Sequence, residues 1–315
     1  MNFLVTGADG FVGNALCQYL LSEGKNVSGS LWHEGLSVPV GVNATVVGDL
    51  NSETKWEKVL NGIDVVVHTA ARVHVMNEGS VDPLSEYRKV NVEGTAKLAK
   101  SAAQEGVKRF VYISSIKVNG ELTSDGKPFK VDSDPVPLDP YGISKFEAEE
   151  ELKKISKDTG MEFVIVRPPL IYGPGVKANF HKMISWVMKG VPLPFGSVKN
   201  KRSFIALENL VDFLYRCAIH PKAANQTFLI SDGRDMSTAE LLKKVAIAVG
   251  KRHRVFPFPV FILAAIGMVF RKKDVVSRLI GNLQVDSTPA FSLLGWKPVI
   301  SIDEALKKVA EGYFS

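Results

Sequence analysis

Cysteine is scarce in this chain of 315 residues, which contains only Cys17 and Cys217. Neither cysteine belongs to a CxxC pair or to a Cys/His group with the spacing of metal ligands, which argues against a structural zinc site. So few cysteines also rule out a small fold held by disulfides, and they fit a reducing compartment, so we expect a cytoplasmic protein. Gly7 and Asp9 interrupt the short apolar start, and no signal peptide is predicted.

Long hydrophobic runs are also absent. The most apolar stretch, residues 255–270, carries no charge, but a bilayer-spanning helix needs about 20 apolar residues and Pro257 and Pro259 shorten this stretch further. We therefore predict a buried helix that forms one side of the domain built by the second half of the chain. Contact with a membrane surface is the less favoured alternative, although the basic residues 271–273 follow directly.

Charge of one sign is only mildly in excess. The chain has 39 basic and 33 acidic residues, a net charge of +6 and a pI near 9.1. It has no dense run of Lys and Arg with interleaved aromatic residues, the pattern typical of nucleic-acid binding. We therefore expect a small phosphorylated ligand as the partner, and no nucleic acid.

What the first half does contain is a regular alternation of short apolar runs and helical patterns. Most of these runs are apolar throughout, as in strands that are buried on both faces of a parallel sheet, and residues 27–31 and 45–47 are weaker strands. The predicted strands are residues 3–6, 27–31, 45–47, 64–68, 110–114 and 163–167, and the predicted helices include 11–23, 86–104 and 142–158. The sequence thus predicts a doubly wound parallel α/β fold.

The rhythm changes after Pro168 and Pro169. We place a domain boundary there, so that residues 1–167 form a first domain and residues 168–315 mainly form a smaller C-terminal α/β domain. A strand at residues 226–230 is expected to return to the first sheet. The helices predicted in this half are residues 180–189, 238–249 and 303–312.

A glycine-rich turn, TGADGFVG (6–13), follows the first predicted strand and opens a helix. Its glycines allow a tight turn, close approach of the backbone to a pyrophosphate, and close packing of helix on strand. The helix N-terminus then offers free N–H groups to the phosphates. This predicts dinucleotide binding in a Rossmann-type domain. The cofactor-binding residues predicted in this turn are Gly7, Gly10, Phe11 and Val12.

The choice of dinucleotide depends on the end of the second strand. Residues 30–34 place no Asp at the strand end for the ribose 2′-hydroxyl of NAD and no Arg for the 2′-phosphate of NADP. We favour NAD slightly and keep NADP as the alternative. Asp49 and Leu50, after the third strand, either meet the adenine or form an ordinary turn.

Tyr141 and Lys145 stand four residues apart on a predicted helix and so share one face. A nearby ammonium favours tyrosinate, so we expect the pKa of Tyr141 to be lowered from about 10. Such a tyrosine is a usable general acid/base for an alcohol–ketone pair. Ser115 follows an apolar strand, and its hydroxyl could bond the same substrate oxygen.

These features together resemble the extended short-chain dehydrogenase/reductase family, in its NAD-dependent nucleotide-sugar epimerase/dehydratase branch. The resemblance covers nearly the whole chain and is closest to bacterial surface-polysaccharide enzymes, including UDP-glucose 4-epimerases. The motifs that carry it are TGADGFVG (6–13), GDL (48–50), HTAA (68–71), NVEGT (91–95), SSIKVNG (114–120), YGISK (141–145), RPPLIYGPG (167–175) and LGWKP (294–298).

The resemblance implies roles for individual residues. It implies catalysis by Ser115, Tyr141 and Lys145, and a homodimer. The cofactor contacts that it implies are Asp49 at the adenine, Ala70 and Ala71 beside the cofactor, Pro168 near the nicotinamide, and Lys145 at the nicotinamide ribose. It also implies that the C-terminal domain binds a nucleotide sugar, with Asn179 and Arg202 at its diphosphate.

Other positions near the predicted strand ends leave alternatives open. Arg72 and His74 either contact the cofactor or the sugar, or lie in a surface loop. His68, at the end of a buried strand, is expected to be a hydrogen-bonded core residue. Lys117 stands where many epimerases carry a small hydroxyl residue, so we place it at the substrate.

The sequence departs from sugar 4,6-dehydratases, which place an Asp-Glu pair after a Thr where this chain has Ile116, Lys117 and Val118. We therefore predict a C4 epimerase of a UDP-linked hexose or N-acetylhexosamine that works through a 4-keto intermediate. The alternatives are an NAD(P)H-dependent 4-keto nucleotide-sugar reductase and, from another class, a non-catalytic dinucleotide-binding regulator.

Overall fold

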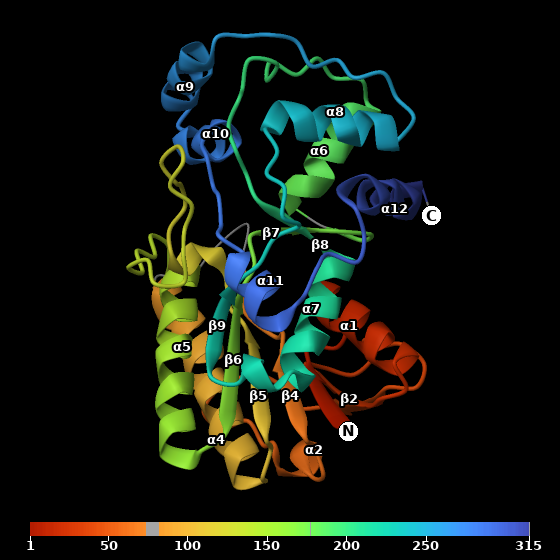
Figure 1. The fold of residues 1–315 in the computed structure, drawn as a ribbon, viewed down its shortest axis with the longest axis vertical. Helices are drawn as coiled ribbons and strands as arrows, with labels where there is room; N and C mark the ends of the chain where they lie inside the picture. The colour runs from red at the N-terminus through yellow and green to blue at the C-terminus, as the bar shows by residue number, and fades with distance from the viewer. Residues whose placement is uncertain (74–81, 177, 315) are drawn as a thin grey trace.

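The computed structural model describes residues 1–73, 82–176 and 178–314. Its main sheet has seven parallel strands in the order β3-β2-β1-β4-β5-β6-β9 (Figure 1). The strands are β1 (Asn2–Thr6), β2 (Asn26–Leu31), β3 (Asn43–Val46), β4 (Val65–His68), β5 (Arg109–Ile113), β6 (Glu162–Arg167) and β9 (Gln226–Leu229). This confirms the predicted Rossmann-type sheet. The strand order reverses between β1 and β4, and ligands of such sheets bind at the carboxyl ends of the strands at that point.

The last strand of the sheet comes from the second half of the chain, as expected. In β9, Gln226 pairs with Val164 and Leu229 pairs with Arg167 of β6. Residues beyond 167 therefore complete the first sheet.

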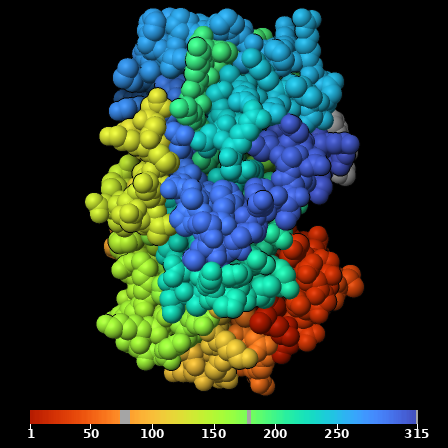
Figure 2. Space-filling view, viewed as in Figure 1, coloured from red at the N-terminus to blue at the C-terminus, as the bar shows by residue number. Residues whose placement is uncertain are grey.

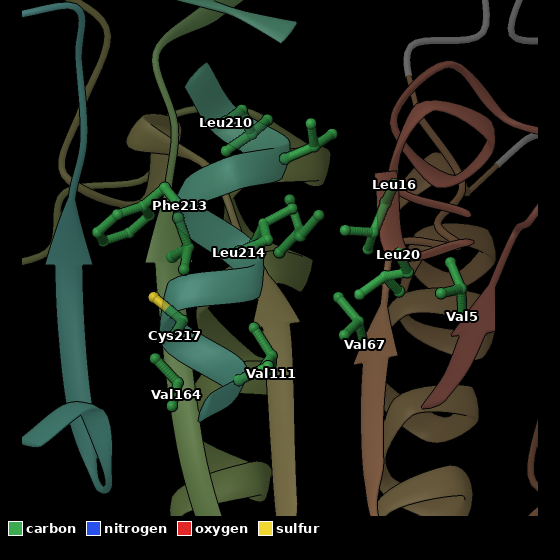
Figure 3. Packing of buried hydrophobic residues seen from close by; sticks show 14 of the residues in the cluster. Val5, Leu16, Leu20, Val67, Val111, Val164, Leu210, Phe213, Leu214 and Cys217 are labelled. Atoms are coloured by element: carbon green, nitrogen blue, oxygen red, sulfur yellow. The ribbon is translucent and has the colours of Figure 1, made fainter. Parts of the chain in front are cut away.

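One face of the sheet is covered by helices α1 (Phe11–Ser22) and α7 (Leu207–Ile219). Strand residues alternate between the two faces, so Phe3 and Val5 of β1 pack with these helices while Leu4 packs on the opposite face. The packed side chains labelled in Figure 3 are Leu16 and Leu20 of α1, Leu210, Phe213, Leu214 and Cys217 of α7, and Val5, Val67, Val111 and Val164 of the sheet.

The other face is covered by α2 (Glu57–Leu60), α4 (Gly94–Gln104) and α5 (Pro140–Thr159). The predicted helix over residues 86–104 is present, but it is built from α3 (Pro83–Arg88), a π-helical segment η1 (Lys89–Glu93) and α4. A short 3₁₀ turn, η2 (Ile116–Val118), follows β5.

A second core lies beyond the carboxyl ends of the main strands (Figure 1). It is shared by the two-stranded parallel sheet and three helices. These elements are β7 (Leu170–Tyr172), β8 (Phe204–Ala206), α6 (Ala178–Met188), α8 (Thr238–Ala248) and α12 (Ile302–Phe314). η3 (Pro221–Ala223) joins α7 to β9 at the amino ends of the strands, and α11 (Thr288–Leu294) packs beside β9.

The apolar stretch 255–270 contains helix α9 (Val260–Val269), which is followed by α10 (Lys273–Ile280). The prediction of a buried helix is wrong, because only Leu263 and Gly267 of α9 are buried. Among the described residues, no helix combines the length and the apolarity needed to cross a membrane.

Candidate active site

The glycine turn joins β1 to α1 at the carboxyl edge of the sheet. Gly7 adopts a left-handed φ of 64°, and a Cβ at this position would lie 3.0 Å from the Cα of Ala70. A Cβ on Gly13 would lie 2.0 Å from the carbonyl oxygen of Gly7. Both positions therefore require glycine, as the sequence predicted, and the loops after β1 and β4 touch.

The loop after β4 is tied to β1 by a buried hydrogen-bond chain. The Thr6 hydroxyl lies 2.6 Å from Nδ1 of His68, and Nε2 of His68 lies 2.9 Å from the Thr95 hydroxyl. The amides of Thr69 and Ala70 both donate to the Thr6 hydroxyl at 3.2 Å. Burial lowers the pKa of His68 to about 3, so the ring is neutral. His68 is thus the hydrogen-bonded core residue that was expected.

Tyr141 and Lys145 lie in the first turns of α5. Asp139 caps this helix by accepting a 2.7 Å hydrogen bond from the Gly142 amide, and Pro140 occupies the first helical position. The Tyr141 side chain lies close enough to the Ser115 side chain, which follows β5, for Ser115 to lower its pKa. The structure therefore brings the three predicted catalytic residues together.

Lys145 is buried beneath the tyrosine. Its Nζ donates to the Ile113 carbonyl at 2.8 Å and lies 4.6 Å from the Tyr112 ring centroid and 5.9 Å from that of Tyr141. Burial lowers the pKa of Lys145 to about 7, against the opposing charge of Glu149.

The pKa of Tyr141 is raised, so the predicted lowering is wrong for the protein without ligands. Burial is the main cause, because it penalises the tyrosinate, and the carboxylate of Asp139 adds to it. The Ser115 side chain acts in the opposite direction. Tyr141 is therefore protonated at neutral pH in this structure.

A buried ion pair supports the site from below. Arg167 donates to both carboxylate oxygens of Glu149, at 2.9 and 2.5 Å, and to the Asn119 side chain at 3.0 Å. Glu149 also accepts a 2.5 Å hydrogen bond from Ser114. This network fixes α5 against the ends of β5 and β6.

Sequence reasoning did not assign a role to Asn91, although its motif was noted. Asn91 lies in the π-helical segment, accepts from the Arg72 amide at 2.9 Å, and donates to the Arg72 carbonyl and the Ser144 hydroxyl at 3.0 and 2.9 Å. It therefore joins the loop after β4 to the catalytic helix. The Arg72 guanidinium lies 5.5 Å from the ring centroid of Tyr87, whose ring packs edge-on against Tyr141. A π-segment in a helix often marks a functional site, but the sequence carries no periodic signal for it.

The remaining cofactor candidates lie around the same edge. The Trp32 indole donates a 2.5 Å hydrogen bond to Asp49, next to Leu50. Pro168 is buried, and its carbonyl accepts from the Ile116 amide at 3.1 Å. The sequence analysis did not single out Trp32, which directly follows β2.

The substrate candidates are more dispersed. Lys117 forms ion pairs with Asp139 and Glu121, and its assignment to the substrate stays a prediction. Arg202 is largely buried and donates to the Gly281 carbonyl at 3.1 Å. Burial lowers its pKa to about 10. The side chain of Asn179, and the whole of His74, lie outside the described residues.

The residues present fit a dinucleotide. Gly7 and Ala70 form a backbone cradle that a single Cβ would fill. Gly10 begins α1 without a side-chain cap among the described residues, so the N–H groups of the first turn are available to phosphate.

Comparisons with known proteins agree with this geometry. Residues 3–231 match the model of the "NAD dependent epimerase/dehydratase family". The chain is 47% identical over 313 residues to the UDP-glucose 4-epimerase of Vibrio cholerae, a match that covers 99% of this chain and 95% of the relative.

Solved structures share the fold. The UDP-glucose 4-epimerase of Thermus thermophilus, solved with NAD, has a TM-score of 0.79 at 22% identity and covers 100% of this chain and 99% of its own. That of Thermotoga maritima, solved with UDP-glucose, gives the same TM-score, identity and coverage. The family resemblance, the prediction of an enzyme and the choice of NAD are confirmed, and the chain belongs to the NAD-dependent epimerase/dehydratase family.

Proposed function

We propose that the protein is a C4 epimerase of a UDP-linked hexose or N-acetylhexosamine that works through a 4-keto intermediate. The observation that carries the proposal is the placement of Tyr141 beside Ser115 and the buried Lys145, at the edge of the sheet that holds the glycine turn. The 47% identity to a UDP-glucose 4-epimerase supports the same substrate class.

When bound, NAD supplies the hydride acceptor and donor, and its oxidised form brings a positive charge. The cofactor would be held by the glycine turn, Ala70, Ala71 and Lys145. The positive charge of the bound cofactor and the Lys145 ammonium would both lower the pKa of Tyr141, so that its tyrosinate form can accept the proton of the C4 hydroxyl and later return it. Ser115 donates a hydrogen bond to the C4 oxygen. The Lys145 ammonium stabilises the tyrosinate that forms. The raised pKa of Tyr141 suits the return of the proton.

The second half of the chain, residues 168–315, would mainly form the nucleotide-sugar site. We assign Arg202 to the diphosphate, because its guanidinium is held in a largely buried position where an anion would compensate its charge. Asn179 is proposed as a second diphosphate ligand, and a homodimer as the working assembly.

A 4-keto-sugar reductase that exchanges NAD(P)H at every turnover is the second candidate. It is favoured by the end of β2, where Trp32 follows Leu31 and no acid is present to hold a ribose 2′-hydroxyl.

The first test is to denature the purified protein and identify the cofactor it releases. We expect stoichiometric NAD, since an epimerase oxidises and reduces its substrate in one closed cycle, and we expect UDP-glucose or UDP-N-acetylglucosamine to be converted to its C4 epimer. A protein that is empty after purification and oxidises NADH or NADPH with a 4-keto sugar would identify the reductase instead.

The second test is the variant Tyr141→Phe. It should lower kcat about 10²- to 10⁴-fold, because it removes the proton acceptor, while NAD remains bound. The matched control is Tyr87→Phe, which removes the hydroxyl of the neighbouring ring and should cost less than about tenfold. Full turnover by Tyr141→Phe would refute the mechanism.

A further inference from the structure

Helix α9 is apolar on every side but is covered on one side only. Its buried residues, Leu263 and Gly267, are four apart and face α10, where a Cβ on Gly267 would lie 2.8 Å from the Val276 side chain. A helix that is apolar all round is normally buried on all sides. The outer face of α9 is therefore an apolar surface that no described part of the chain covers.

The exposed side chains of this face are large. Phe261 and Val269 are each 76% exposed, and Phe270, just after the helix, is 70% exposed. Met268 is exposed beside them, and Phe256 is exposed in the segment that leads into the helix. Figures 1 and 2 place α9, α10 and the segment before them at the end of the molecule opposite α2.

Two basic clusters flank the apolar helix, and we call this set of residues the basic flanks. They are Lys251, Arg252 and Arg254 before the helix, and Arg271, Lys272 and Lys273 after it. All six are exposed, and none forms an ion pair within the described parts of the chain. Residues 250–273 contain no Asp or Glu, and these six cations equal the net charge of +6 of the whole chain.

The hairpin of α9 and α10 is fixed to the body of the protein. Arg278 of α10 donates to both carboxylate oxygens of Glu121, at 2.9 and 3.1 Å. Glu121 in turn pairs with Lys117. This anchoring presents the outer face of α9 in a defined orientation.

We infer that this end of the protein docks on an anionic lipid surface. Exposed apolar and aromatic side chains next to exposed Lys and Arg supply the two contributions that hold a protein on a membrane interface, which are buried apolar area and electrostatic attraction to anionic lipids. The basic flanks would attract anionic headgroups while Phe261, Met268 and Val269 enter the boundary of the acyl chains. A second copy of the chain fits this face less well, because two copies would bring their basic flanks together. The inference reverses the expectation that residues 255–270 avoid membrane contact, and it does not depend on the proposed reaction.

The experiment is sedimentation of the full chain with vesicles of phosphatidylcholine containing about a third phosphatidylglycerol, compared with vesicles of phosphatidylcholine alone. We expect binding to the anionic vesicles that decreases as salt is added. Arg271→Glu/Lys272→Glu should lower the partition coefficient by at least about fivefold per charge. The control is Lys55→Glu/Lys58→Glu, which makes the same change in net charge on exposed side chains at the opposite end of the molecule. It should change the partition coefficient by less than about twofold.

The apolar contribution is tested with Phe261→Gln/Val269→Gln, which alters only exposed side chains. We expect loss of about tenfold in binding, whereas Val40→Gln, an exposed apolar residue of the first half, should have no effect. Equal sedimentation with neutral vesicles, or no sedimentation with either, would overturn the inference. So would a change in oligomeric state of Phe261→Gln/Val269→Gln measured by light scattering, since the face would then be an interface between copies.

Discussion

The ammonium of Lys117 is ion-paired with the carboxylate of Asp139, the residue that caps the helix carrying Tyr141 and Lys145. Lys117 stands two residues after Ser115, so the pair joins the loop that carries Ser115 to the helix that carries the other two predicted catalytic residues. Asp139 also raises the pKa of Tyr141. By pairing with Asp139, Lys117 therefore limits the increase that this carboxylate causes in the pKa of Tyr141.

We expect Lys117→Met to lower kcat about tenfold with little change in KM. We also expect the acidic limb of the pH profile, where activity rises as tyrosinate forms, to move to higher pH, because an unpaired Asp139 disfavours tyrosinate more strongly. The measurement is kcat and KM across pH. Glu121→Gln, which removes the other partner of Lys117, is the control and should leave the pH profile in place. A rise in KM at constant kcat would instead show Lys117 contacting the substrate.

Gly7 and Gly24 form a matched pair, with φ of 64° and 67°. A Cβ on Gly24 meets nothing within 4 Å, whereas one on Gly7 meets Ala70. Both Gly→Ala variants should lose about 1 kcal/mol of unfolding free energy from the left-handed backbone. Gly7→Ala alone should lose more, and should also lose retained NAD. Urea unfolding measures the stability of the two variants, and cofactor extraction measures their retained NAD. A normal NAD content in Gly7→Ala would show that the cofactor does not bind at this turn.

The buried pair Arg167–Glu149 should respond strongly to removal of one partner. Arg167→Met leaves the fully buried Glu149 carboxylate without its cation, and should cost about 3–5 kcal/mol of unfolding free energy. Arg88→Met breaks the half-exposed pair with Glu147 and should cost far less, because solvent screens that pair. The double variant Arg167→Met/Glu149→Leu should recover part of the loss. Equal losses in the two single variants would contradict this account.

His68 makes the protein sensitive to acid. Its pKa is about 3 in the folded chain and about 6.5 when unfolded, so the unfolded state binds the extra proton between these values. Stability is therefore unaffected by His68 above pH 6.5 and falls by about 1.4 kcal/mol per unit as the pH drops toward 3. Urea unfolding at pH 7 and pH 5 of the wild type and His68→Gln measures this. We expect the unfolding free energy to decrease less between pH 7 and pH 5 in His68→Gln than in the wild type. An equal decrease in both proteins would show that His68 is not the cause.

Much of the first half could be predicted because the signals are local. The buried strands are apolar runs, and the glycine turn needs glycine at Gly7 and Gly13 for reasons of backbone space alone. The spacing of Tyr141 and Lys145 fixes their common helical face. Helix α7 was missed although its buried Leu207, Leu210 and Leu214 recur at helical spacing, so a local signal was present there.

Other features depend on contacts between distant segments. The pKa of Tyr141 was predicted with the wrong sign, because spacing indicates the nearby Lys145 but not the burial that penalises tyrosinate. The role of Asn91 arises from three hydrogen bonds to Arg72 and Ser144, which lie on two other segments.

The sequence by itself determined the parallel sheet and the glycine turn, and it predicted the candidate catalytic residues, because the signals for each lie within short segments. Only the tertiary structure decided the charge state of those residues and the exposure of α9. Both depend on how much water reaches a side chain, and that is set by which distant segments pack over it. An apolar helix can be covered by the protein's own core or left at its surface with the same sequence, and the packing of α9 against α10 leaves it at the surface.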